Sequence, residues 1–282
     1  MATQNVSTLT NAALLKDTYT SDFALAPTEE AVIADFANKP VGMEKIGKKL
    51  YFRKIKAVIS GKYTGTSGLP ANLTATQANT EEAPSTLLSY GYAMLELDEP
   101  ALTRLVEDGK YRNGIRKQLA AAVNAMPDTD LFLLAASLSH TESGAAINDT
   151  TYMSGIGQLS TYAKNKFKLG ETDARLFIHP TQVKNGLAIE AARQYIIRGS
   201  QGSAVNAQLD AYGLSVRESG LVYDNGANKF NVLCTKDAFG IGYNITPSAL
   251  PEQQDGIVTR ILFRSEYGVL TQFDECAVAF LT

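Results

Sequence analysis

The side chains that could do chemistry in this chain are few and lie far apart in the sequence. His140 and His179 are the only histidines, and Cys234 and Cys276 are the only cysteines. Neither histidine has the spacing from cysteines or carboxylates that zinc ligands usually have. Two cysteines cannot form a disulfide framework, so we expect both to be buried as small apolar residues in strands.

Compact catalytic and nucleotide-binding motifs are also missing from the sequence. Ser154-Gly155-Ile156-Gly157 lacks the preceding strand and the later acid of a dinucleotide-binding fingerprint. Gly61-Lys62-Tyr63-Thr64 lacks the upstream glycine of a phosphate-binding loop, and no Gly-x-Ser-x-Gly elbow occurs. We therefore predict no catalytic residue, no metal site and no cofactor. An α/β enzyme whose carboxylate, serine or lysine site leaves no compact motif stays open as a remote alternative.

Charge placement is more informative than single reactive groups. Residues 45–62 contain no acid and seven cations, which are Lys45, Lys48, Lys49, Arg53, Lys54, Lys56 and Lys62. Acids follow later in the chain, at Glu81, Glu82, Glu96, Asp98, Glu99, Glu107 and Asp108. The basic run could be a solvated face that keeps an edge strand from aggregating, or a contact with an acidic surface of a neighbouring subunit. Contact with nucleic acid phosphates is the weakest interpretation, because the net charge is -3.

The elements that carry these charges predict an extended hairpin over residues 47–98. One apolar strand pattern spans 48–63, a second spans 85–97, and about twenty polar residues separate them. Each arm could reach about 45 Å, whereas a compact chain of this length has a radius of gyration of about 19 Å. A two-stranded ribbon is marginally stable alone in water. We therefore expect the ribbon to lie on another copy of the chain.

The remaining pattern predicts a mixed fold of helices and strands. We expect a short helix from Thr28 to Ala37 and a longer one of about 25 residues that starts at Asp98-Glu99-Pro100 and ends near Met126, before Pro127. The second half predicts helices over 151–167 and 181–197, with strands at 174–178, 212–223, 229–234 and 239–244 and a turn at 224–226. Two closing strands are expected to meet at Tyr267-Gly268. No apolar run approaches the roughly 18 residues that span a bilayer, so we predict no membrane association.

The order of these elements resembles the major capsid proteins of tailed bacteriophages, which have the Hong Kong 97-type fold. The resemblance covers nearly the whole chain. An N-terminal arm precedes a paired-strand loop with Gly68-Leu69-Pro70 near its tip, and a return strand, STLLSYGYAMLELDEPAL, leads into a long helix. Later signposts are DARLFIHP, DAYGLSVRESGLVY, NVLCTKDAFGIGY and FRSEYGVL.

This resemblance implies an α+β capsid subunit with four parts. They are an N-terminal arm (1–44), an extended loop (45–97), a peripheral domain with a spine helix (98–139 and 256–276) and an axial domain (140–255 and 277–282). The implied function is self-assembly into hexamers and pentamers of an icosahedral virion shell that encloses double-stranded DNA without sequence-specific binding. Assembly would take place in the host cytoplasm. An encapsulin-type shell of a cellular nanocompartment has the same fold and stays as the alternative.

The resemblance also implies further partners and two sets of contact residues. Partners would include a portal, possible cement proteins and, since no charged N-terminal helical extension is present, a separate scaffolding protein or prior cleavage. The expected inter-subunit contacts are Arg53, Lys54, Lys56, Gly68, Leu69, Pro70, Glu96, Asp98, Glu99 and Glu107. The Gly/Ser/Gln-rich loop that would lie at the capsomer axis contains Arg198, Gly199, Ser200, Gln201, Gly202 and Ser203.

Overall fold

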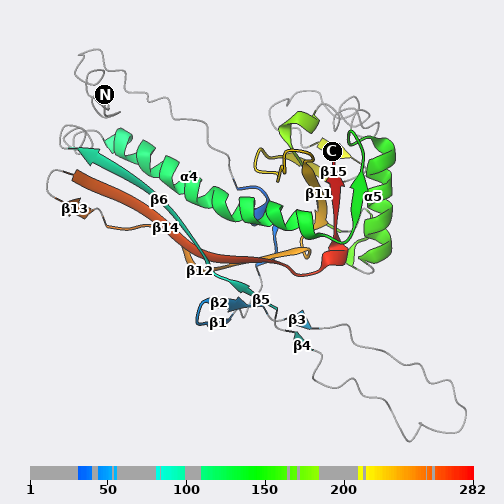
Figure 1. Cartoon of the computed structure of the whole chain (residues 1–282), viewed down its shortest axis with the longest axis horizontal. Helices are drawn as coiled ribbons and strands as arrows, with labels where there is room; N and C mark the ends of the chain where they lie inside the picture. Colours follow the sequence, from blue (N-terminus) through cyan, green and yellow to red (C-terminus); the bar gives the residue numbers. More distant parts are fainter. Residues whose placement is uncertain are drawn as a thin grey trace, which may run out of the picture.

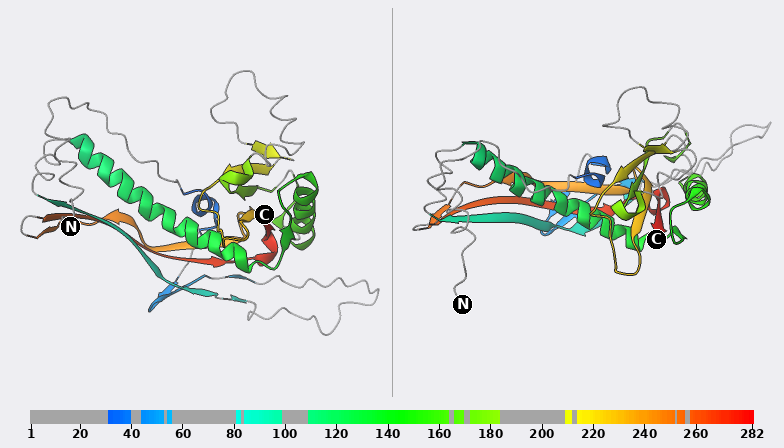
Figure 2. Two further views of the ribbon diagram at one scale, coloured as in Figure 1. Left: turned by 45° about the horizontal axis from the view of Figure 1, so that its top comes forward. Right: turned by 90° about the horizontal axis from the view of Figure 1, so that it is seen from above.

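The computed structural model of the chain shows an elongated α+β molecule (Figure 1). It describes residues 31–39, 44–52, 54–55, 81–82, 84–98, 109–163, 166–169, 172–183, 209–211, 214–251, 253–255 and 258–282. A long sheet under one long helix forms one end, and a compact sheet with a shorter helix forms the other. A small three-stranded sheet lies on the side of the long sheet opposite the helix (Figures 1 and 2). The predicted α+β class is confirmed.

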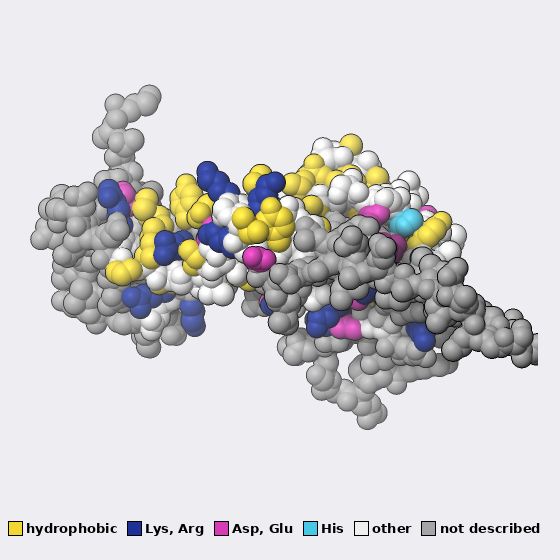
Figure 3. All heavy atoms as spheres, turned by 90° about the horizontal axis from the view of Figure 1, so that it is seen from below, with side chains coloured by type: hydrophobic (Ala, Val, Ile, Leu, Met, Phe, Trp, Pro, Cys, Tyr) yellow, Lys and Arg dark blue, Asp and Glu magenta, His cyan; other side chains and the backbone are white. Residues whose placement is uncertain are grey.

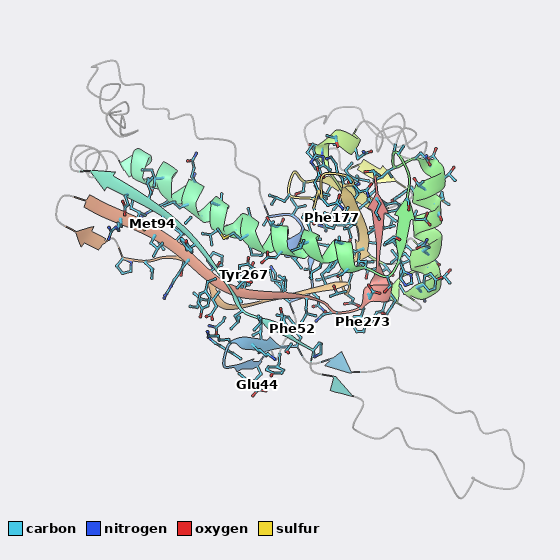
Figure 4. All side chains as sticks on the ribbon, viewed as in Figure 1. Glu44, Phe52, Met94, Phe177, Tyr267 and Phe273 are labelled. Carbon is cyan, nitrogen blue, oxygen red and sulfur yellow. The ribbon has the colours of Figure 1, made fainter. Side chains whose placement is uncertain are left out.

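Strand β14 (Val258–Thr271) is the centre of the long sheet. Residues 258–267 pair antiparallel with β6 (Ser89–Asp98), and β14 also pairs antiparallel with β12 (Phe239–Ala249) and β13 (Gln253–Asp255). Side chains of β14 alternate between the two faces of the sheet. Ile261, Ser265 and Tyr267 are buried on the face that α4 (Gly109–Leu134) covers. The Tyr267 hydroxyl donates to Asp130 Oδ2 of α4 at 2.8 Å. Tyr267 lies between the long sheet and α4 (Figure 4).

The predicted hairpin pairing is confirmed near its base, where residues 49–51 pair with 85–87 and residues 54–55 with 81–82. The later part of the return strand differs from the prediction, because β6 pairs with β14. Gly91 of β6 lies against α4, and a Cβ there would lie 2.8 Å from Met126 Sδ. The predicted break at Tyr267-Gly268 is absent, and β14 runs through both residues. Gly268 marks a close approach of another strand there, since a Cβ would lie 2.6 Å from Thr86 Cγ2.

Helix α4 differs from its prediction at both ends. Asp98 is the last residue of β6 and does not start the helix, and residues 99–108 lie outside the described part. Pro127 does not end the helix, which continues to Leu134. An interior proline costs about 3 kcal/mol, and here the following turn buries Leu131 and Phe132 in the main core, which offsets that cost.

Judged by length and composition alone, the stretch Asn113–Ser137 is apolar enough to cross a membrane, although it contains no uninterrupted apolar run of that length. The core helix of a soluble protein meets the same criterion. In this fold the stretch lies on the long sheet and buries Val123, Leu131 and the side chain of Asp128.

The predicted helix from Thr28 to Ala37 is shorter in the structure. Helix α2 spans only Ile33–Phe36, and Ala31 and Val32 are not helical; Thr28 lies outside the described residues. The side chain of Asp128 accepts the backbone N–H groups of Val32, Ile33 and Ala34, at 2.5, 3.2 and 2.7 Å. A carboxylate from α4 therefore accepts hydrogen bonds from the free backbone N–H groups at the N-terminus of α2. The sequence predicts instead that a neighbouring residue, Thr28, caps this helix.

The compact sheet has six strands in the order β7-β15-β11-β8-β10-β9. Their bounds are β7 (Thr141–Ser143), β15 (Ala277–Leu281), β11 (Phe230–Thr235), β8 (Ala174–Ile178), β10 (Leu214–Glu218) and β9 (Leu209–Ala211). Helix α5 (Asp149–Tyr162) packs on β15, and the short helices are η1 (Ala135–Ser137), η3 (Pro180–Gln182) and η4 (Asp274–Cys276). Phe177 of β8 meets Phe36 and Phe132 at ring distances of 5.8 and 6.0 Å, which joins α2, α4 and this sheet in one core (Figure 4).

Several predictions for this half are confirmed, with changes in detail. The strand at 174–178 is β8, and the strand at 239–244 extends to residue 249. The helix predicted over 151–167 is α5, which begins earlier because Asn148 caps it. The turn at 224–226 forms with Gly226 at φ 83°, but β8 lies between the strands that flank it. Nearly all of the predicted helix 181–197 lies outside the described residues.

Candidate assembly surface

The base of the predicted hairpin is a three-stranded sheet with two different faces. It consists of β1 (Glu44–Ile46), β2 (Lys49–Tyr51) and β5 (Ser85–Leu87), all antiparallel. Lys45, Leu50 and Thr86 form one row across the three strands, and this row faces the long sheet. The next row, Ile46, Lys49 and Leu87, faces the opposite way and is exposed.

An apolar cluster joins the three-stranded sheet to the long sheet. Leu50, Phe52 and Leu270 are buried together, and the partly buried Leu88 packs against them. The backbone at Gly268 allows this contact, because any side chain there would collide with Thr86. Phe52 lies between the two sheets in Figure 4. The hairpin base is thus held on β14 by a small core of its own.

A buried carboxylate lies beside this cluster. Glu266 of β14 is only 2 % exposed, and Lys45 Nζ donates to its two oxygens at 3.2 and 3.4 Å. The side chains of Asn244 and Tyr90 donate to the same carboxylate. Burial opposes the charge of Glu266, but these hydrogen bonds and Lys45 outweigh it and lower the pKa. In return, the hydrogen bond to Glu266 raises the pKa of Tyr90.

Strand β6 presents a row of large apolar side chains to solvent. Tyr90, Tyr92 and Met94 alternate along it and are 70%, 67% and 49% exposed. They lie on the face opposite α4, where hydrophobic side chains are interspersed with Lys and Arg (Figure 3). We call Ile46, Leu87, Tyr90, Tyr92 and Met94 the apolar stripe. Of the ten large exposed hydrophobic side chains in the described residues, six fall within residues 44–98, so this segment is where the fold leaves apolar surface uncovered.

Charged groups accompany the stripe on the same face of the sheet. Arg260 Nε donates to Glu96 Oε1 across the β14–β6 pair at 2.7 Å. Arg264 is exposed opposite Tyr92. The face therefore combines Tyr, Met and Arg side chains, which are enriched in protein interfaces relative to the rest of the surface.

Few of the predicted inter-subunit residues have a described side chain. Glu96 is exposed and pairs with Arg260 of its own chain. Lys54 lies in β3 (Lys54–Ile55), whose partner β4 (Glu81–Glu82) places Glu82 opposite it. Asp98 ends β6, opposite Val258. Both predicted sets are otherwise outside the described residues: Arg53, Lys56, Gly68, Leu69, Pro70, Glu99 and Glu107, and the axis loop Arg198, Gly199, Ser200, Gln201, Gly202 and Ser203.

The residues that the sequence prediction left out of the site are the stripe and Glu266. Tyr90, Tyr92 and Met94 were assigned to a strand, and their alternation with Gly91 and Ala93 is the signal for a one-sided exposed face. No local pattern marks Glu266, because its partners come from three other strands.

The cysteines and histidines have structural surroundings in this fold. Cys234 and Cys276 are buried and unbridged; Cys234 lies in β11 as predicted, whereas Cys276 ends η4. Burial raises the pKa of both thiols, that of Cys276 to about 11. His179 caps η3, and His140 stacks on Tyr162 with ring centroids 4.0 Å apart. Within the described ranges, no group of three or more His, Cys, Asp or Glu side chains could hold a metal ion.

Comparison with known proteins identifies the fold. No protein-family model matches the chain, and no curated protein does. Solved structures do: the capsid of the cyanophage P-SCSP1u has a TM-score of 0.66 at 12% identity, covering 95% of this chain and 93% of that chain. The capsid of Ralstonia phage GP4 has a TM-score of 0.62 at 10% identity, covering 95% of each chain. The head structure of the Helicobacter pylori bacteriophage KHP40 has a TM-score of 0.62 at 11% identity, covering 99% of this chain and 98% of that chain. This chain has the α+β, Hong Kong 97-type fold of tailed-phage capsid proteins.

Proposed function

We propose that the chain is the major capsid protein of a tailed phage and that it assembles into hexamers and pentamers of an icosahedral shell around double-stranded DNA. The apolar stripe is the observation that carries this proposal. A capsid-type fold that exposes Tyr90 and Tyr92 by 70% and 67% has surface that a second copy can bury. The protein would then be structural and non-enzymatic, and its location would be the virion.

The proposal includes the four-part division of the chain. The peripheral domain would comprise 98–139 with 256–276, and the axial domain 140–255 with 277–282. The arm would be 1–44 and the extended loop 45–97. The pairing of β6 with β14 supports a smaller loop, since residues 89–98 belong to the long sheet.

Contacts between copies would involve the basic strand and the axis loop. Arg53, Lys54 and Lys56 would meet acids of a neighbour, with Glu96, Asp98, Glu99 and Glu107 as the candidates. Glu96 fits this role less well, because Arg260 already pairs with it. The extended-loop tip, Gly68-Leu69-Pro70, would meet the neighbour as well. The loop of Arg198, Gly199, Ser200, Gln201, Gly202 and Ser203 would line the capsomer axis.

The basic strand can be tested by charge reversal. Changing Arg53, Lys54 and Lys56 to Glu should slow or misdirect assembly, and reversing the candidate acids should restore it in part. Each exposed pair contributes about 0.2–1 kcal/mol, but the copies of a shell multiply the effect. Assembly that is indifferent to both charge reversal and salt would leave these charges as a solvated face only.

Other partners follow from the same proposal. Assembly in the host cytoplasm would use a portal and a separate scaffolding protein, with cement proteins as further candidates. An encapsulin-type shell would have the same fold, and its contents discriminate the two: double-stranded DNA fills a phage head, whereas a cargo protein fills a nanocompartment.

Electron microscopy of the expressed full-length chain tests the function directly. Residues 57–79 can be replaced by Asn-Gly, a sequence that favours a two-residue hairpin turn, because β3 and β4 already pair at this point. The shortened chain should keep the circular dichroism spectrum and the cooperative unfolding of the parent, yet form no stable shells. Normal shells from the shortened chain, or no shells from the full chain, would contradict the proposal.

A further inference from the structure

Glu266 is buried at the border between the part of this sheet face that is open to solvent and the part that the three-stranded sheet covers. Its neighbours on that face, Tyr90 and Arg264, are exposed, whereas Glu266 is 2 % exposed. The three-stranded sheet covers this position through Lys45. A carboxylate loses hydration there, and that loss must be offset by directed partners.

Those partners come from three other strands. Lys45 Nζ reaches the carboxylate from β1, the Tyr90 hydroxyl from β6 and the Asn244 amide from β12. Two of these strands belong to the long sheet, and β1 belongs to the three-stranded sheet. Through Lys45, Glu266 thus makes a polar contact that joins the two sheets.

We propose that Glu266 is a positioning residue that holds the three-stranded sheet, and with it the base of the extended hairpin, at one angle to the long sheet. The part of this inference that concerns assembly rests on the proposed function. Its geometric part concerns the single chain and stands without it.

The directionality of the contacts explains why Glu266 sets the angle. The apolar cluster of Leu50, Phe52 and Leu270 holds the two sheets together, but apolar contact has no preferred direction. Hydrogen bonds weaken steeply when their angle is poor. With Lys45 held against Glu266, rotation of the three-stranded sheet about the cluster breaks the charged contact. Without that contact, the cluster, the packing of Thr86 on Gly268 and the short link from β5 to β6 still hold the sheet, but no charged hydrogen bond from Lys45 opposes a small rotation.

A small rotation at the base has a large effect further along the predicted hairpin. An arm of about 12 residues would reach about 40 Å in strand geometry. A rotation of about 10° at its base would then displace the tip by about 7 Å, which is more than the spacing between neighbouring strands. A loop that must meet a neighbouring subunit therefore needs a fixed base.

The experiment measures the angle in the unassembled, full-length chain. Spin labels at Lys48→Cys, in the turn between β1 and β2, and at Asn124→Cys, on the exposed side of α4, report the distance between the two parts. Native Cys234 and Cys276 are buried, so two labels per chain are expected. The parent should give one narrow distance distribution, and Glu266→Gln and Lys45→Met should each broaden it.

Matched controls separate positioning from general damage. Glu96→Gln removes a carboxylate from the same face, but its partner Arg260 lies within the long sheet, so the distribution should stay narrow. The exchange Lys45→Glu with Glu266→Lys should narrow the distribution again relative to either single change. The inference would be overturned if the Glu266→Gln variant unfolds cooperatively and its spin-label distance distribution superimposes on that of the parent.

Assembly provides the second measurement. Glu266→Gln should give fewer closed and more irregular particles than the parent in electron micrographs. Normal shells from a Glu266→Gln chain whose distribution is broadened would overturn the assembly part of the inference. If the parent itself forms no shells, the proposed function fails, while the distance measurement still decides the role of Glu266.

Discussion

Two buried carboxylates, Asp128 and Glu266, each join segments that are far apart in the sequence. Asp128 accepts three backbone N–H groups from residues 32–34, and Glu266 binds Lys45. Burial raises the pKa of Asp128 in spite of its three donors, whereas the hydrogen bonds and Lys45 lower the pKa of Glu266 in spite of its burial. The two residues therefore respond to pH in opposite directions.

Replacing Asp128 by Ala should destabilise the fold by about 2–4 kcal/mol, because buried N–H donors of residues 32–34 would lose their acceptor. Urea unfolding measures the change. Thr129→Ala, at an exposed position in the same helix, is the control and should change the free energy of unfolding by less than about 0.5 kcal/mol. Equal stabilities for the two variants would show that Asp128 does not anchor this segment.

Glu266 should make the free energy of unfolding depend on pH. A folded-state pKa below the unfolded value means that its contribution is present above the ordinary pKa of 4.5 and is lost as pH falls through the lowered value. The stability difference between the parent and Glu266→Gln should therefore be constant near neutral pH and shrink in acid. Denaturant titrations over a pH series measure this difference, and a difference that does not vary with pH would contradict the expectation.

At the scale of elements, the contact of β5 with β14 depends on a glycine. Gly268 lies within the continuous strand β14. Because it has no side chain, Thr86 and Leu50 can pack directly against its backbone. The strand therefore continues through a residue that usually weakens strands, because a second sheet packs against it there.

Gly268→Ala should destabilise the chain by about 1–3 kcal/mol, since the new methyl group would collide with Thr86 Cγ2. Adding Thr86→Ser removes that methyl group and should recover part of the loss in thermal or denaturant unfolding. Gly157→Ala is the matched control: a Cβ at Gly157, within α5, meets nothing within 4 Å, so the change should stabilise the helix by up to about 1 kcal/mol. If Gly268→Ala were as stable as Gly157→Ala, the two sheets would not approach each other as closely at Gly268 as the structure indicates.

At the scale of the whole molecule, the apolar stripe separates folding from assembly. Apart from Tyr90, whose hydroxyl donates to Glu266, its side chains contribute little to the single chain because they are exposed, yet they are the kind of side chains that dominate interfaces. Their effect should therefore appear only when copies meet.

Changing Tyr92 and Met94 together to Thr should alter the free energy of unfolding of the single chain by less than about 1 kcal/mol, because surface changes usually stay within about 0.5 kcal/mol each. The same variant should fail to assemble at concentrations where the parent forms particles, since losing an interface hot spot costs about 2 kcal/mol or more per contact. Sedimentation and electron microscopy measure the assembly. Leu169→Ser, at a residue 53% exposed outside the stripe, is the control. Normal particles from the stripe variant would place the contact elsewhere.

The sequence alone determined the elements whose pattern is local. Alternation and turn chemistry predicted β8 and the turn at residues 224–226, and the order of elements predicted the capsid-type fold. The buried state of Cys234 also followed from residue type, because a small apolar side chain within a strand of this composition is usually buried.

Only the tertiary structure decided the features that depend on contacts between distant segments. Helix α4 passes through Pro127 because the next turn packs in the core, and α2 starts at Ile33 because Asp128 lies at its N-terminus. Strand β14 passes Gly268 because another sheet needs the space, and Glu266 is buried because Lys45 reaches it from 221 residues away. Local propensities amount to about 1 kcal/mol per residue, or about 3 for proline. Burial and directed hydrogen bonds between remote residues are of the same size or larger, so they decide the outcome wherever the two disagree.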